Sequence, residues 1–77
     1  MVKTQNVDTK LLDEAVEKSG LKTSYIVDKL GISKQAYHTK RNGKIAFRQS
    51  EVYVLCDLLH LNDEERMKIF FPEMLGH

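Results

Sequence analysis

Four side chains that can make specific hydrogen bonds lie close together in the chain: Lys34, Gln35, His38 and Thr39. In a helix that begins just after Ser33, the helical period leaves these four on the outer face and turns Ala36 and Tyr37 inward. In the DNA major groove, a lysine ammonium can donate to O6 and N7 of guanine, and a glutamine amide can pair with N6 and N7 of adenine. We therefore expect this face to contact base edges of double-stranded DNA.

Basic residues are concentrated around the same stretch. The 22 residues from Lys29 to Ser50 contain no acid and six basic residues: Lys29, Lys34, Lys40, Arg41, Lys44 and Arg48. This window is at +6 and the other 55 residues are at −5, which gives the net charge of +1. Such a concentration is typical of a surface that follows DNA phosphates. We expect Lys40, Arg41 and Arg48 to contact phosphates. Lys40 and Arg41 stand about one helical turn after the inward residues of this helix, where another apolar inward residue would be usual.

Length and composition limit the chain to one small domain. A chain of 77 residues buries only about 60% of its unfolded surface, which leaves little core for an enclosed enzyme pocket. With 42% hydrophobic and 30% charged residues and a net charge of +1, it is typical of a globular protein rather than a disordered one. We expect a binding module without a cofactor, and not an enzyme.

The single cysteine, Cys56, cannot form an internal disulfide, which favours a reducing compartment. The sequence shows no secretory signal and no apolar run long enough to span a bilayer, so we expect a cytoplasmic protein with no membrane partner. Cys56 and His60 are spaced so that they can share a helix face, which would permit metal binding or a Cys-His pair. A lone cysteine in a leucine-rich helix is more often a small core residue, and we expect no metal site.

The periodic pattern of apolar residues predicts five short helices and no strands. The first helix is expected at 9–19, the fourth from 49 or 50 to about 60, and the fifth from 63 to 70 or 71. The second helix is expected to be capped by Thr23 or Ser24 and to end at 30. The third is expected to begin just after Ser33 and to end at the Asn42-Gly43 pair. Residues 1–7 are expected to form a loose arm and residues 72–77 an apolar tail. We expect the polar face of the first helix, including Asp13, to be solvated, and Tyr37 and Phe47 to lie in the core. The whole chain, 1–77, is predicted to be one all-α domain.

The stretch from Thr23 to Lys44 carries a recognisable local pattern. Ile26 is followed by the run Leu30-Gly31-Ile32-Ser33 and then by Asn42-Gly43-Lys44, within five helices in the expected order. On these residues the chain resembles the phage repressor and Cro-like helix-turn-helix family, also described as lambda-repressor-like or Xre-type. The resemblance covers nearly the whole chain.

This resemblance implies a five-helix lambda-repressor-like fold and a transcription regulator, typically from a phage or prophage. Its third helix would enter the major groove, and it would bind a palindromic operator as a dimer. By position, Lys34, Gln35 and Thr39 would face base edges. The residues that would contact phosphates at the two ends of the motif are Thr23, Asn42 and Lys44.

A second hypothesis is a protein-interaction module that keeps this fold. In that role the chain would be an antirepressor or modulator of a phage genetic switch that binds a partner repressor protein. It is motivated by the near-zero net charge, the apolar tail and two departures from the family: Val27 stands where alanine is usual and Lys40 where an apolar residue is usual. Because a basic patch can bind an acidic protein as well as DNA, the sequence leaves this hypothesis open.

Apolar residues near the end of the sequence provide a candidate surface for self-association. Two modules related by a two-fold axis would read half-sites about 34 Å apart, and so more sequence than one module. The expected dimer or partner contact lies at the fifth helix and the tail, through Phe70, Phe71, Met74 and Leu75. The alternative is that these residues only cover the end of the bundle.

Overall fold

The structure is a computed structural model that describes residues 7–72. These residues form five α-helices and no strand: α1 (Thr9–Ser19), α2 (Thr23–Leu30), α3 (Lys34–Arg41), α4 (Gln49–Leu59) and α5 (Asp63–Phe70). The predicted all-α, five-helix architecture is confirmed, and the predicted helix bounds agree closely with those observed.

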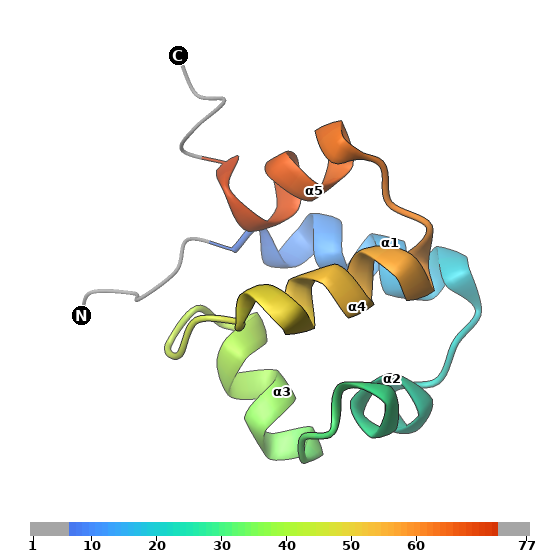
Figure 1. Cartoon of the computed structure of the whole chain (residues 1–77), viewed down its shortest axis with the longest axis vertical. Coiled ribbons are helices and arrows are strands. Elements are labelled where there is room, and N and C mark those ends of the chain that lie inside the picture. Colours follow the sequence, from blue (N-terminus) through green and yellow to red (C-terminus); the bar gives the residue numbers. More distant parts are fainter. Residues whose placement is uncertain (1–6, 73–77) are drawn as a thin grey trace.

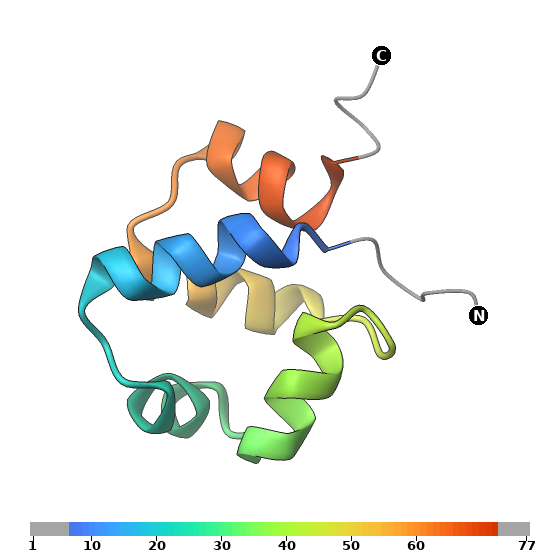
Figure 2. The same cartoon turned by 180° about the vertical axis from the view of Figure 1, so that it is seen from behind.

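The helices are arranged around one core, with α4 and α1 on opposite faces (Figures 1 and 2). α5 lies at one end of the molecule, where it packs against α1. The α2–α3 pair forms the other end, and α2 packs against both α3 and α4. No helix within residues 7–72 has the length and apolar content that crossing a membrane requires.

Side-chain caps set several of the helix ends. The Asp8 carboxylate accepts a hydrogen bond from the backbone N–H of Leu11 (3.1 Å), which starts α1. Asn62 and Glu65 each accept from the other's backbone N–H, at 2.8 and 2.9 Å, which starts α5. Such caps satisfy N–H groups that have no partner within the helix. They depend only on neighbouring residues, which is why they can be recognised in the sequence.

The start of α2 differs from the prediction. Lys22 occupies the N-cap position, and no side chain caps this end. The expectation that Thr23 or Ser24 caps α2 is therefore wrong, because the helix begins at Thr23 itself. The first backbone N–H groups of α2 thus remain without a side-chain partner.

The core is built from all five helices and the connections beside them. Its four largest fully buried side chains are Leu12, Ile26, Leu55 and Phe70. The ring of Phe47 makes edge-to-face contacts with Tyr37 and Phe70, at centroid distances of 6.1 and 5.6 Å. The predicted core positions of Tyr37 and Phe47 are confirmed. This aromatic cluster joins the inner face of α3 to α5 through the α3–α4 connection.

Two expectations about the ends of the chain need correction. Val7, predicted to be part of a loose arm, is only 5% exposed, and the N–H of Asp8 next to it donates to the carbonyl of Ile69 (2.7 Å). Phe70, predicted as a dimer or partner contact, is 1% exposed and belongs to the core. Phe71 is half-buried, and the other two residues of that predicted contact, Met74 and Leu75, lie outside the described residues.

Candidate nucleic-acid interface

A three-residue turn, Gly31-Ile32-Ser33, joins α2 to α3. Gly31 adopts a φ of 73°, in the left-handed region where side chains are disfavoured. The N–H of Ile32 donates to the carbonyl of Val27 (3.1 Å), and the side chain of Ile32 packs against the core. The Ser33 hydroxyl then accepts from the N–H of Ala36 (3.0 Å) and starts α3. The predicted turn is confirmed, and it fixes the direction in which α3 leaves α2.

The outer face of α3 carries the residues predicted to contact bases. Lys34, Gln35 and His38 are exposed, whereas Tyr37 on the inner face is 3% exposed. Thr39 is half-buried, and its hydroxyl donates to the carbonyl of Gln35 (2.9 Å). The structure therefore brings three of the four residues together on one accessible surface, with Thr39 at its edge.

Lys40 points inward and pairs with an acid on α4. Its ammonium donates to both carboxylate oxygens of Glu51, at 2.6 and 2.8 Å, and the two side chains are only 11% and 8% exposed. Glu51 also accepts from the backbone N–H of Arg48 (2.9 Å). The expectation that Lys40 reaches a phosphate is wrong, because a charge at this buried position requires an opposite charge beside it.

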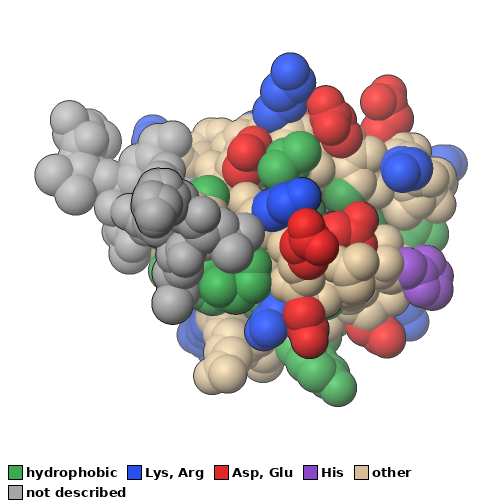
Figure 3. All heavy atoms as spheres, turned by 90° about the horizontal axis from the view of Figure 1, so that it is seen from above, with side chains coloured by type: hydrophobic (Ala, Val, Ile, Leu, Met, Phe, Trp, Pro, Cys, Tyr) green, Lys and Arg blue, Asp and Glu red, His purple; other side chains and the backbone are tan. Residues whose placement is uncertain are grey.

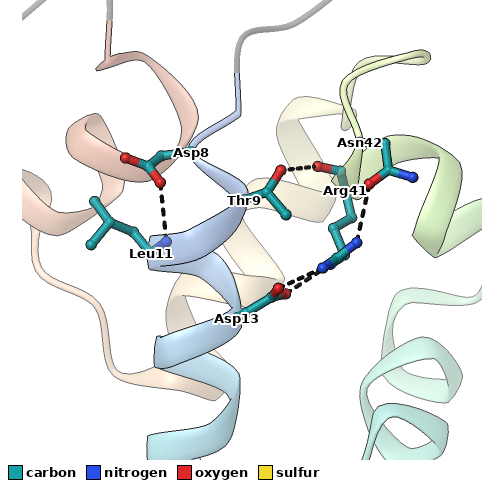
Figure 4. A network of polar contacts seen from close by, with 6 residues as sticks. All are labelled: Asp8, Thr9, Leu11, Asp13, Arg41 and Asn42. Carbon is teal, nitrogen blue, oxygen red and sulfur yellow. Dashed lines mark hydrogen bonds and ion pairs between the residues drawn. The ribbon is translucent and has the colours of Figure 1, made fainter.

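Arg41 ties the end of α3 to α1, as Figure 4 shows. Its guanidinium donates to both carboxylate oxygens of Asp13, with 2.7 Å between Nε and Oδ1, and to the side-chain oxygen of Asn42 (3.0 Å). The hydroxyl of Thr9 donates to the backbone carbonyl of Arg41 (3.0 Å). The guanidinium is thus engaged within the protein in this structure, and it does not extend outward as expected for a phosphate contact.

The two ion pairs perturb the titration of their members. The hydrogen bond from Arg41 lowers the pKa of Asp13, although burial opposes this shift. Burial alone would raise the pKa of Glu51, but the hydrogen bonds from Lys40 and from the Arg48 backbone outweigh it and lower that pKa. The hydrogen bond to Asp13 raises the pKa of Arg41. Both carboxylates are therefore ionised at neutral pH and hold α3 as charged partners.

The other residues predicted to contact phosphates lie at the ends of α2 and α3. Thr23 is the half-buried first residue of α2, and Lys44 and Arg48 are exposed on the connection between α3 and α4. Asn42 is exposed with a φ of −82°, so Gly43, with a φ of 82°, supplies the positive φ expected of the Asn-Gly pair. Exposed basic side chains therefore remain beside α3 without Lys40 and Arg41.

Cys56 and His60 lie near the end of α4. Cys56 is half-buried, and burial raises the pKa of its thiol. His60 follows the last residue of α4 with a φ of 55°. Within residues 7–72, no group of three or more His, Cys, Asp or Glu side chains is placed to hold a metal ion. This part of the chain offers no additional ligands to the Cys-His pair.

Two acids that position α3, Asp13 and Glu51, are not apparent from the sequence. The helical period alone assigns Asp13 to a solvated face, yet it pairs with a residue 28 positions away, and Glu51 pairs with one 11 positions away. The available signal is Lys40, which lies at an inward position of its helix. A base at such a position predicts an acid on a facing helix, but the sequence does not show which acid.

In comparisons with known proteins, no family model, no curated protein and no solved structure matches the chain.

Proposed function

We propose that the chain is a sequence-specific, double-stranded DNA-binding regulator of transcription, of the repressor or Cro type. The observation that carries the proposal is the outer face of α3, where Lys34, Gln35 and His38 are exposed together on a helix that contains no acid. The major groove of DNA admits an α-helix. In a helix-turn-helix pair, the N-terminal residues of the second helix contact base edges, and Lys34 and Gln35 hold that position in α3.

The distribution of charge over the molecule supports this role. From Thr23 to Ser50, which includes α2 and α3, the only acid is Asp28. The opposite end is mixed: in Figure 3, which looks onto the end that carries α5, acidic and basic side chains are interspersed. α5 itself begins with Asp63, Glu64 and Glu65. This asymmetry would orient the α2–α3 end toward a polyanion.

The inner side of α3 is held in a way that suits recognition. The ion pairs of Lys40 and Arg41 fasten its C-terminal end to α4 and α1, and the Ser33 cap fixes its N-terminal end. A helix held in its binding orientation loses little conformational freedom when it binds, so less of the interaction energy is lost to ordering. Lys40 and Arg41 would thus support DNA binding without contacting DNA.

Phosphate contacts and dimerisation complete the proposal. Thr23 lies at the uncapped start of α2, where free backbone N–H groups favour an anion. Lys44 and Arg48 lie on the far side of α3, in the α3–α4 connection. Contacts on both sides would set the register of α3 in the groove. A homodimer on a two-fold symmetric operator would then read two half-sites.

The test is a titration of the purified chain into duplexes selected from a random library and into scrambled duplexes, at two salt concentrations. We expect preferential binding to the selected duplex, with an affinity that falls steeply with salt because each neutralised phosphate releases counterions. Gln35→Ala combined with His38→Ala should reduce the preference by about 1–3 kcal/mol for each good base contact that is lost.

A matched pair of lysine variants provides the control. Lys34→Ala and Lys18→Ala remove the same charge from exposed positions on α3 and α1. Only Lys34→Ala should weaken binding to the selected duplex. Equal effects of the two substitutions, or no duplex binding at low salt, would contradict the proposal. The latter result would favour the hypothesis of a partner repressor protein.

A further inference from the structure

A groove is lined by residues of α4, of the connection after it and of α5; α4 is the helix that lies in front of α1 in Figure 1. Its volume is about 690 Å³, and the side chains that line it include Val52, Tyr53, Asp57, Arg66 and Phe71. Tyr53 is 78% exposed, the highest value among the large hydrophobic residues in the described part of the chain. An aromatic ring exposed beside other apolar groups is typical of a surface that another molecule covers.

Two charged groups in this groove lack good partners. Arg66 Nε is buried and has no hydrogen-bond acceptor among the described residues, and Arg66 Nη2 lies 3.8 Å from Asp63 Oδ1. Asp57 is exposed and makes no ion pair within residues 7–72. A buried donor without an acceptor is destabilising. The Arg66 side chain is 42% exposed, so its guanidinium can donate to a carboxylate from outside the chain through the nitrogens other than the buried Nε.

We propose that the α4–α5 groove is the contact surface between two copies of this chain. The groove carries both an unpaired acid and an under-satisfied base, and is in that respect complementary to itself. In a two-fold interface each contact occurs twice, so Arg66 of one copy facing Asp57 of the other forms two equivalent charge pairs. Tyr53 and Phe71 form the apolar centre, in the place where interfaces bury aromatic side chains.

The position of the groove is compatible with DNA reading. α2 and α3 lie at the lower end of the molecule in Figure 1, whereas the groove lies along α4 toward α5. A two-fold axis in front of α4 and parallel to the long axis of the molecule keeps both α3 helices at the same end. Such a dimer would let two copies of α3 read one operator, so its purpose rests on the proposed function. Self-association itself can be measured without DNA.

Sedimentation equilibrium of the full chain tests the interface. The unaltered chain is expected to dimerise, and Asp57→Arg should weaken self-association by about tenfold or more because it sets like charges against Arg66. Asp57 is exposed in the last turn of α4, where the helix dipole stabilises a positive charge. This substitution should therefore not unfold the chain. Arg66→Asp should weaken self-association similarly. An equimolar mixture of the two variants should restore a dimer, since both repulsions then become attractions.

Two further variants separate this interface from other surfaces. Glu17→Arg makes a matching charge change on an exposed position of α1 and should leave the dimer intact. Met74→Ser with Leu75→Ser tests the tail. The proposal is overturned by a chain that stays monomeric at millimolar concentration, by an Asp57→Arg chain that dimerises normally, or by a dimer lost only in the tail variant. Because Asp57→Arg leaves α3 unchanged, its binding to a single half-site should persist, which distinguishes failure of the dimer from failure of DNA binding.

Discussion

At the scale of single residues, the buried pair of Lys40 and Glu51 is expected to have a large effect on stability. Lys40→Met would leave the Glu51 carboxylate, 8% exposed, without its partner. Removing one member of a buried pair typically costs about 3–5 kcal/mol, so the free energy of unfolding should fall by about that amount. Urea unfolding followed by circular dichroism measures it.

A second variant distinguishes the charge from the packing. Glu51→Gln added to Lys40→Met should recover much of the lost stability, because the amide can still accept the hydrogen bond from the Arg48 backbone without burying a charge. A loss below about 1 kcal/mol in the single variant would be the value of an exposed pair. It would show that the Lys40 ammonium has ready access to water.

Asp13 and Glu51 also predict a specific sensitivity to acid. The pKa of each carboxyl is lowered in the folded chain, so each contributes stability above the pKa of an unfolded carboxyl, about 4. That contribution is lost as the pH falls through the lowered pKa values. The free energy of unfolding, measured with urea over a pH series, should therefore decrease below about pH 5.

The control for this acid sensitivity uses carboxylates without such partners. Asp13→Asn with Glu51→Gln should flatten the pH dependence, whereas Glu14→Gln with Glu17→Gln, at two exposed positions of α1, should leave it largely unchanged. Equal pH profiles for the two double variants would show that these ion pairs do not set the acid response.

At the scale of elements, the turn between α2 and α3 depends on one backbone conformation. Gly31 has a φ of 73°, and a Cβ there would meet no atom within 4 Å, so an alanine would be disfavoured by its backbone alone. Gly31→Ala should lower the free energy of unfolding by about 1–2 kcal/mol, and Gly31→Asn by less, since asparagine tolerates this region better. Thermal and urea unfolding measure both.

Gly20 is a matched control for that turn. It has a φ of 75° and equally open space at the end of α1, so Gly20→Ala should cost about as much as Gly31→Ala. A much larger loss for Gly31→Ala would mean that the angle between α2 and α3, and not only the local conformation, depends on this glycine.

The helices could be predicted because their signals are local. Asp8, Ser33 and Asn62 each accept a hydrogen bond from an N–H three residues ahead, so residue type and position suffice to place these starts. The start of α2 lacks such a signal, since Lys22 provides no side-chain cap. The partners of Lys40 and Arg41 depend on how α1 and α4 pack beside α3, which no local pattern specifies.

At the scale of the whole molecule, the charge counted along the basic window, Lys29 to Ser50, overstates the net positive charge of that region in the folded chain. Two of its six basic residues are neutralised by acids from elsewhere in the chain, Asp13 and Glu51. Counting charges along the sequence locates the basic window but does not show that Lys40 and Arg41 are paired, because the pairing exists only in the folded state. The exposed face of α3 is less affected, since the helical period alone separates Lys34, Gln35 and His38 from buried Tyr37.

This distinction predicts different salt dependences for two arginine variants. Arg48→Gln and Arg41→Gln make the same chemical change, but Arg48 is exposed and Arg41 is held by Asp13. When the logarithm of DNA affinity is plotted against the logarithm of salt concentration, Arg48→Gln should reduce the slope by about 1, the value for one phosphate contact. Arg41→Gln should leave the slope near that of the unaltered chain and instead lower the free energy of unfolding. An equal reduction of slope in both variants would mean that Arg41 leaves Asp13 for a phosphate when DNA binds, so that this ion pair would compete with DNA instead of positioning α3.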